Sequence, residues 1–176
     1  ECKDVPTTIY VSKRELTGDD ELPGATLTIK DWKGNVIREW VSTTEKHEVN
    51  ALSFTDGHNE FTLTETRPAD GYALASDITF KVVRRVDKDG NELDAVDVYY
   101  KAKDEEGKEV WKLLDDETVI MRDDITRVKI SKKDITNNDE LPGAKLKIED
   151  SNGNTVESWT SKKEPHYIEK LPAGDY

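Results

Sequence analysis

Three ionisable residues occupy positions at which a strand pattern would place apolar ones. In the segment IYVSK, Lys13 follows Ile9 and Val11 at intervals of two residues. Residues two apart share one face of a strand, so Lys13 is expected to point into a core. The segments FTLTE and TVIMRD repeat this arrangement and place Glu65 and Asp123 after their own apolar residues. An isolated buried charge is costly, so these groups are expected to be paired, neutral or hydrogen-bonded.

Short strands must carry these residues. Apolar and polar residues alternate in IYVSK, ATLTIKD, NVIREW, EFTLTE, ITFKVV and TVIM, which is typical of half-buried strands. The segments between them, among them WKGN, DKDGN, DEEGK and SNGN, place a glycine where a hairpin needs a positive φ. The pattern predicts an all-β fold, an antiparallel sandwich of immunoglobulin-like shape, with an added hairpin around residues 82–114.

One phrase occurs twice in the chain, as SKRELTGDDELPGA beginning at Ser12 and as SKKDITNNDELPGA beginning at Ser131. The match continues on both sides of the phrase, which is the signature of a repeat array. We therefore expect a last-strand remnant of a preceding repeat in residues 1–6 and a complete repeat in residues 7–125. Residues 126–176 would then be the first half of the next repeat.

Composition excludes several classes of protein and of site. The net charge is −12, which argues against nucleic-acid binding because that needs clustered Lys and Arg. The single cysteine, Cys2, rules out an internal disulfide. No apolar run reaches the roughly 18 to 20 residues of a membrane span, so we expect no membrane insertion. The first residues, ECKDVPTT, lack the regions of a signal peptide, so a targeting segment is expected outside this chain.

No metal or cofactor site is expected. The histidines His47, His58 and His166 lack the paired spacing of metal ligands. The segment DKDGNELD has its glycine at the fourth position, whereas a calcium-binding EF-hand loop needs it at the sixth. A hairpin turn is the better interpretation of that segment.

The quoted motifs resemble the Cna B-type or SpaA-type repeats of Gram-positive pilins and surface adhesins. The resemblance rests on the first-strand lysine followed by LPGA, on FTLTETRPADGY and on the closing TVIMRDD, and it covers essentially the whole chain. FTLTETRPADGY is similar to the pilin E-box. It departs from that pattern at Phe61, where a tyrosine is expected, and in the order of Pro68 and Ala69.

The resemblance implies an intramolecular isopeptide bond between Lys13 and Asp123, promoted by Glu65. Burial disfavours charged forms, so a neutral lysine amine could act as the nucleophile while the glutamate stays protonated and hydrogen-bonds the aspartate carbonyl. Closure would release one water molecule. Asp124 is an alternative acceptor, although strand alternation points its side chain outward. A buried salt bridge that never condenses is the other alternative.

The repeat also predicts two unpaired equivalents of these residues. Lys132 matches Lys13, but its glutamate and its acceptor would lie beyond the end of this sequence. Asp4 matches Asp123 and would be the acceptor left from a preceding repeat. We expect neither to be linked within this chain.

The function implied by the resemblance is that of a structural stalk repeat in a Gram-positive surface adhesin or pilus protein, extracellular and attached to the cell wall. Its partners would be neighbouring repeats of the same array. A crosslink that forms once does not make the protein an enzyme. The alternative is a ligand-binding adhesin module for a host matrix protein or a glycan, with SFTDGHNE as a contact loop and exposed aromatic residues such as Trp32 as a carbohydrate platform.

Overall fold

Two units make up the chain in the computed structural model, which describes residues 7–55 and 57–176. Unit 1 extends to Ala69 and continues over Leu74–Asp124. Unit 2 comprises Asp70–Ala73 and Ile125–Tyr176. Within the described ranges, no helix is long and apolar enough to span a membrane.

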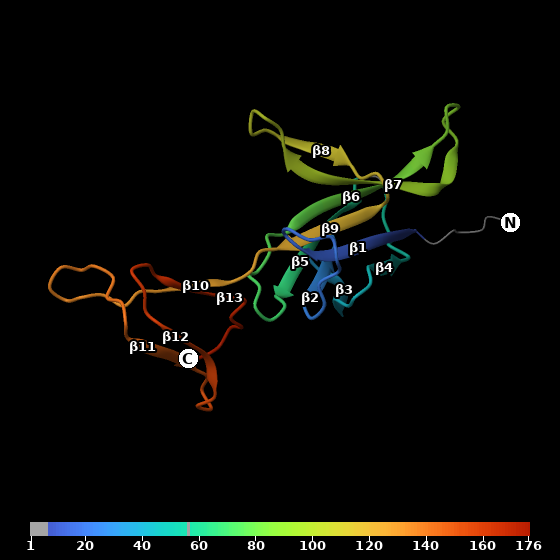
Figure 1. Cartoon of the computed structure of the whole chain (residues 1–176). Helices are drawn as coiled ribbons and strands as arrows, with labels where there is room; N and C mark the ends of the chain where they lie inside the picture. Colours follow the sequence, from blue (N-terminus) through green and yellow to red (C-terminus); the bar gives the residue numbers. More distant parts are fainter. Residues whose placement is uncertain (1–6, 56) are drawn as a thin grey trace. The chain divides into compact units, whose positions relative to one another are not determined.

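Unit 1 is built from strands in two sheets (Figure 1). In chain order the strands are β1 (Thr8–Glu15), β2 (Thr26–Lys30), β3 (Val36–Val41), β4 (His47–Asn50), β5 (Glu60–Arg67), β6 (Ile78–Val86), β7 (Glu92–Lys103), β8 (Glu109–Leu113) and β9 (Thr118–Asp123). One sheet has the order β4-β1-β9, and the other has the order β3-β2-β5-β6-β7-β8. This arrangement confirms the expected all-β sandwich.

The first and last strands of unit 1 are neighbours, and they pair in parallel. Lys13 lies opposite Met121, and Glu15 lies opposite Asp123. The other strand pairs of the described chain are antiparallel. The parallel pairing brings the ends of β1 and β9 that carry Lys13 and Asp123 to the same side of the unit.

The core lies between the two sheets and is formed by alternate residues of their strands, as the period of two requires. Its buried members are Ile9, Val11, Leu27, Ile29, Val49, Leu52, Phe61, Leu63, Phe80, Val82, Val96, Val98, Val119 and Met121. The rings of Phe61 and Phe80 stack with centroids 5.5 Å apart. Burial of such side chains is the main favourable contribution to the stability of the sandwich.

Two long hairpins extend the larger sheet, one joining β6 to β7 and the other joining β7 to β8. Figure 1 shows them on the opposite side of unit 1 from β3 and β4. They account for the added hairpin expected around residues 82–114. Strand β4 was not expected, because only Val49 of its four residues is buried and the alternation is too short to detect.

Three hairpin turns share the pattern Asp-x-x-Gly-Asn. The carboxylate of Asp31 accepts hydrogen bonds from the backbone N–H groups of Lys33 and Asn35 and from the Asn35 side-chain amide, at 2.9 to 3.0 Å. The same bonds recur in the turns at residues 87–91 and 150–154. The glycine of each turn has φ between 82° and 86°, a conformation that costs other residues energy. Each turn is therefore defined by the hydrogen bonds between its first residue, Asp, and its last residue, Asn, and by the glycine that adopts the positive φ.

Unit 2 contains two pairs of short strands. They are β10 (Arg127–Ile130), β11 (Lys145–Glu149), β12 (Thr155–Thr160) and β13 (His166–Glu169). Strand β10 pairs with β13, and β11 pairs with β12. These pairings correspond to β1 with β4 and β2 with β3 in unit 1, so the internal repeat of the sequence is also a repeat of structure.

Candidate functional site

Lys13, Glu65 and Asp123 converge inside the sandwich of unit 1. Lys13 on β1 and Asp123 on β9 come from the smaller sheet, and Glu65 on β5 comes from the facing sheet. Their exposed fractions are 1%, 2% and 1%. Each follows two buried apolar residues on the inward face of its strand, and this alternation is what turns the three side chains toward one another.

The Lys13 amine contacts both carboxyl groups. Its Nζ donates a hydrogen bond to Oδ1 of Asp123 and lies 2.9 Å from Oε1 of Glu65. Asp124, the other potential acceptor, has an exposed side chain. Of the two adjacent aspartates, Asp123 is therefore the one that the structure places beside the amine.

One ammonium group facing two buried carboxyl groups leaves the site one proton short of neutrality if all three ionise. Burial is the main cause that raises the pKa of Asp123, to about 6, and the negative charge of Glu65 raises it further, while Lys13 opposes the shift. Among the described residues, Oε1 of Glu65 and Oδ2 of Asp123 have no hydrogen-bond partner. A neutral Asp123 carboxyl group is therefore accessible close to neutral pH.

The Glu65 carboxyl group is fixed from its other side by the backbone. Its Oε2 accepts a hydrogen bond from the N–H of Ala75 at 2.7 Å. Ala75 follows the segment RPADGY and packs against the core. This bond leaves Oε1 directed at the amine. Sequence reasoning missed it, because a backbone donor has no side-chain signature.

The backbone of Lys13 is held by the end of the repeated phrase. Glu21 accepts hydrogen bonds from the Lys13 N–H at 3.0 Å and from the Ser12 hydroxyl. The N–H of Leu22 donates to the Lys13 carbonyl at 2.6 Å. The end of the phrase therefore holds the N–H and the carbonyl group of Lys13 in place. This gives a physical reason why the lysine and the segment ELPGA occur together in the sequence.

A nucleophilic nitrogen, a carboxyl carbon and a second carboxyl group are the components of amide formation. A buried amine held against a neutral carboxyl group can condense with it when a neighbouring group transfers the proton.

Within residues 7–55 and 57–176, no three His, Cys, Asp or Glu side chains lie close enough together to hold a metal ion.

The sequence profile of the SpaA prealbumin-like fold domain matches residues 7–99 and 126–176, which is more than half of the chain. The chain belongs to this SpaA family. The resemblance noted from the lysine, E-box and closing motifs is thereby confirmed. The two matched segments fall in the two copies of the internal repeat.

Solved structures similar to this SpaA chain include a Bacillus anthracis protein and two pilins. The TIE protein of Bacillus anthracis, shaft pilin SpaA of Lactobacillus rhamnosus GG and a streptococcal ancillary pilin have 18%, 15% and 18% identity, with TM-scores of 0.45, 0.43 and 0.42. The matches cover 97%, 85% and 98% of this chain and 27%, 62% and 52% of those chains. This chain therefore spans less than two thirds of each neighbour. No curated protein matches its sequence.

Lys132, the equivalent of Lys13 in the second copy of the repeat, lies in a different environment. Lys132 is exposed, although the N–H of Leu141 donates to its carbonyl at 2.6 Å, as the N–H of Leu22 does for Lys13. This backbone hydrogen bond is thus repeated at a lysine that is not buried. Asp4 lies outside the described residues, so its expected lack of a partner stays a prediction.

A Lys13→Met variant of the SpaA domain is expected to lose stability as the pH rises. Without the lysine, burial and Glu65 remain, and both raise the pKa of Asp123 above its ordinary value of 3.8. The folded state then holds a proton that the unfolded state has released, so the stabilisation is present below pH 4 and is lost as the pH rises through about 6 and beyond. We expect the free energy of unfolding in urea to be at least about 1 kcal/mol lower at pH 8 than at pH 5.

The matched control is the double variant Lys13→Met/Asp123→Asn, which has no titratable group at position 123. It should show a much smaller difference between the two pH values. Equal pH dependence in the single and double variants would mean that Asp123 is not the group responsible.

Proposed function

We propose that this chain is a structural repeat of a Gram-positive surface or pilus protein, closed by an isopeptide bond between Lys13 and Asp123. The observation that carries the proposal is the buried Lys13 amine, which contacts Asp123 while Glu65 lies 2.9 Å away. Membership of the SpaA family and the internal repeat support the structural role. The protein would lie outside the cell, attached to the wall, with neighbouring repeats of its own array as partners.

Condensation requires neutral forms of the two reacting groups. Nζ of the neutral Lys13 amine attacks Cγ of the neutral Asp123 carboxyl group, and a C–N bond forms. Glu65 takes a proton from the nitrogen and gives one to the departing oxygen, so the C–O bond breaks and one water molecule leaves. Contact in a folded core supplies the effective concentration for the step. The reaction occurs once per chain, so the domain is not an enzyme.

The intact mass of the purified chain tests the proposal. We expect it to be lower than the mass calculated from the sequence by one water molecule. A protease digest should contain a branched peptide in which Lys13 is joined to Asp123. The full calculated mass, with both residues recovered in linear peptides, would leave the site as a buried salt bridge.

Variants at the same positions sharpen the measurement. Lys13→Ala and Glu65→Gln should both have the full calculated mass, the first for lack of the nucleophile and the second for lack of the proton carrier. Asp123→Asn should lose ammonia in place of water. Lys132→Ala is the matched control, because its exposed lysine has no part in the reaction, and it should still lose one water molecule.

A further inference from the structure

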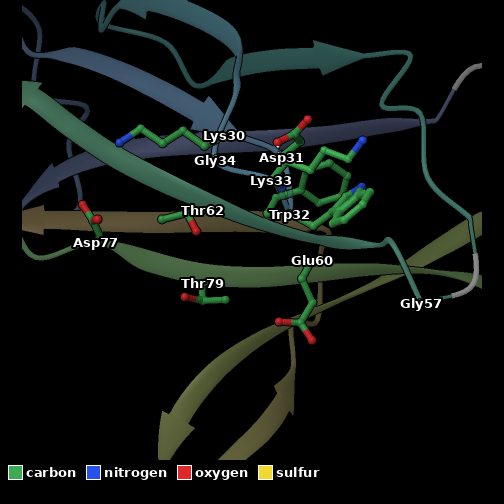
Figure 2. Close-up of a pocket in the computed structure, with 11 residues that line it drawn as sticks. Lys30, Asp31, Trp32, Lys33, Gly34, Gly57, Glu60, Thr62, Asp77 and Thr79 are labelled. Atoms are coloured by element: carbon green, nitrogen blue, oxygen red, sulfur yellow. Dashed lines mark hydrogen bonds between the residues drawn. The ribbon is translucent and has the colours of Figure 1, made fainter.

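A groove lies on the outer face of the larger sheet in unit 1, on the opposite face of that sheet from the buried lysine site. Its volume is 540 Å³, within the range of about 300 to 1,000 Å³ for small-ligand sites. Figure 2 shows Thr62 and Thr79 in the middle, with Lys30 and Asp77 toward one end and Trp32 toward the other. The groove takes no part in the proposed crosslink.

Strand register builds the floor of this groove. Lys30 on β2 lies opposite Thr62 on β5, and Thr62 lies opposite Thr79 on β6. Residues directly opposite each other point to the same face of a sheet. Their chain neighbours Ile29 and Phe80 are fully buried on the inner face, so the lysine and the two hydroxyl groups point outward and form one polar row.

A fixed indole ring forms one end of the groove. Trp32 is 49% exposed, and it lies in the turn that Asp31 closes through its hydrogen bonds to Asn35. Its ring stacks on that of His58, with centroids 3.9 Å apart and planes inclined by 17°. The Nζ of Lys33 lies 4.7 Å from the ring centroid. A large aromatic surface is thus held in place and still reaches solvent.

The second copy of the repeat shows that the fold does not need this tryptophan. The turn at residues 150–154 has the same hydrogen bonds as the turn at Asp31, but Ser151 occupies the position of Trp32. The segment SFTDGHNE, which carries His58, also has no counterpart there, since the second copy reads LPAG. The exposed ring pair is an addition to a turn that forms without it.

The chemistry of the lining selects one class of ligand. Glu60 and Asp77 supply exposed carboxylates, two threonines supply hydroxyl groups, and Lys30 supplies an ammonium group. Asp31 is a third carboxylate in the lining, and its hydrogen bonds hold its pKa below the usual value. The carboxylates of the groove therefore outnumber its lysines, and this excess of negative charge disfavours an anionic ligand. In the described part of the chain, no three acidic groups are close enough for a metal ion.

We propose that this groove binds a neutral oligosaccharide. A sugar ring presents an apolar C–H face, which packs on an aromatic surface such as that of Trp32. Its hydroxyl groups both donate and accept, which matches the carboxylates of Glu60 and Asp77 and the hydroxyls of Thr62 and Thr79. The site would give the repeat a binding function in addition to the structural role.

The test is an NMR titration of the full chain with neutral oligosaccharides, namely maltotriose, cellotriose, triacetylchitotriose and lacto-N-neotetraose, and with the acidic sialyllactose. We expect at least one neutral sugar to give saturable shifts in the backbone amides of residues 31–34, 60–62 and 77–79. Trp32→Ser should weaken that binding by at least about tenfold. It should fold normally, because Ser151 occupies the same turn in the second copy.

Trp111→Ser is the matched control, because Trp111 lies outside the groove on β8, against Lys81 and Lys101. It should bind the sugar as the unaltered chain does. Absence of saturable shifts with all the neutral sugars, binding of sialyllactose alone, or an unchanged dissociation constant in Trp32→Ser would each overturn the proposal. A far-UV circular dichroism spectrum of each variant shows that its sheet is intact.

Discussion

Unit 1 of the unaltered chain is expected to withstand tension without extending, when it is pulled through handles placed before β1 and after β9. If Lys13 and Asp123 are joined, the force passes from the start of β1 through the crosslink to the end of β9. Asp123 follows Lys13 at a sequence separation of 110, so residues 14–122 then lie outside the loaded path. Glu65→Gln, which should lack the bond, is expected to release that segment and lengthen by about 360 to 400 Å.

Single-molecule force spectroscopy measures this difference directly. The effect is large because β1 and β9 pair in parallel, so an unlinked unit must resist by shearing these two strands past each other. A length increase in the unaltered chain equal to that of Glu65→Gln would show that no covalent bond carries the load. Lys132→Ala, altered outside the loaded segment, should behave as the unaltered chain does.

The crosslink is also expected to raise the free energy of unfolding of the chain in solution by a large amount. Closing a loop of about 110 residues removes entropy from the unfolded chain, by analogy with a disulfide, and is worth about 4 to 5 kcal/mol. Condensation also replaces charged or titrating groups in the core by an amide, which lowers the cost of burying them. Glu65→Gln is therefore expected to unfold at a much lower guanidinium concentration than the unaltered chain.

Asp123→Asn gives the matched comparison for the denaturation experiment. If it condenses with loss of ammonia, it forms the same crosslink with Glu65 still present, and its unfolding midpoint should equal that of the unaltered chain. A Glu65→Gln midpoint as high as both of these would mean that the crosslink adds no stability, or has not formed. Mass spectrometry on the same samples distinguishes these two explanations.

Much of the fold followed from the sequence because a period of two is a strong signal in a two-layer sandwich. The alternation in IYVSK, FTLTE and TVIMRD predicted inward positions for Lys13, Glu65 and Asp123, and the structure buries all three. The same alternation predicted an outward position for Asp124, which is exposed. The chemical roles of these residues stay predictions, because burial and contact alone do not form a bond.

Other features could not be predicted from residue patterns. The parallel pairing of β1 with β9 joins segments far apart in the sequence, and alternation says nothing about strand direction. The N–H of Ala75, which holds Glu65, is a group that almost every residue has. The hydrogen bond from the Lys13 N–H to Glu21 could not be predicted either. The repetition of the phrase was evident in the sequence, but repetition does not show which residues of the phrase contact one another.

The Asp-x-x-Gly-Asn turns give this domain convenient places for engineering. In the turn between β6 and β7, Asp87 and Asn91 make the hydrogen bonds that define the loop, and the side chains of Lys88 and Asp89 are exposed. A dye or a short epitope attached at Lys88 would replace only solvent contacts. If the domain is crosslinked as proposed, such a turn would display its cargo on a scaffold that stays folded under load.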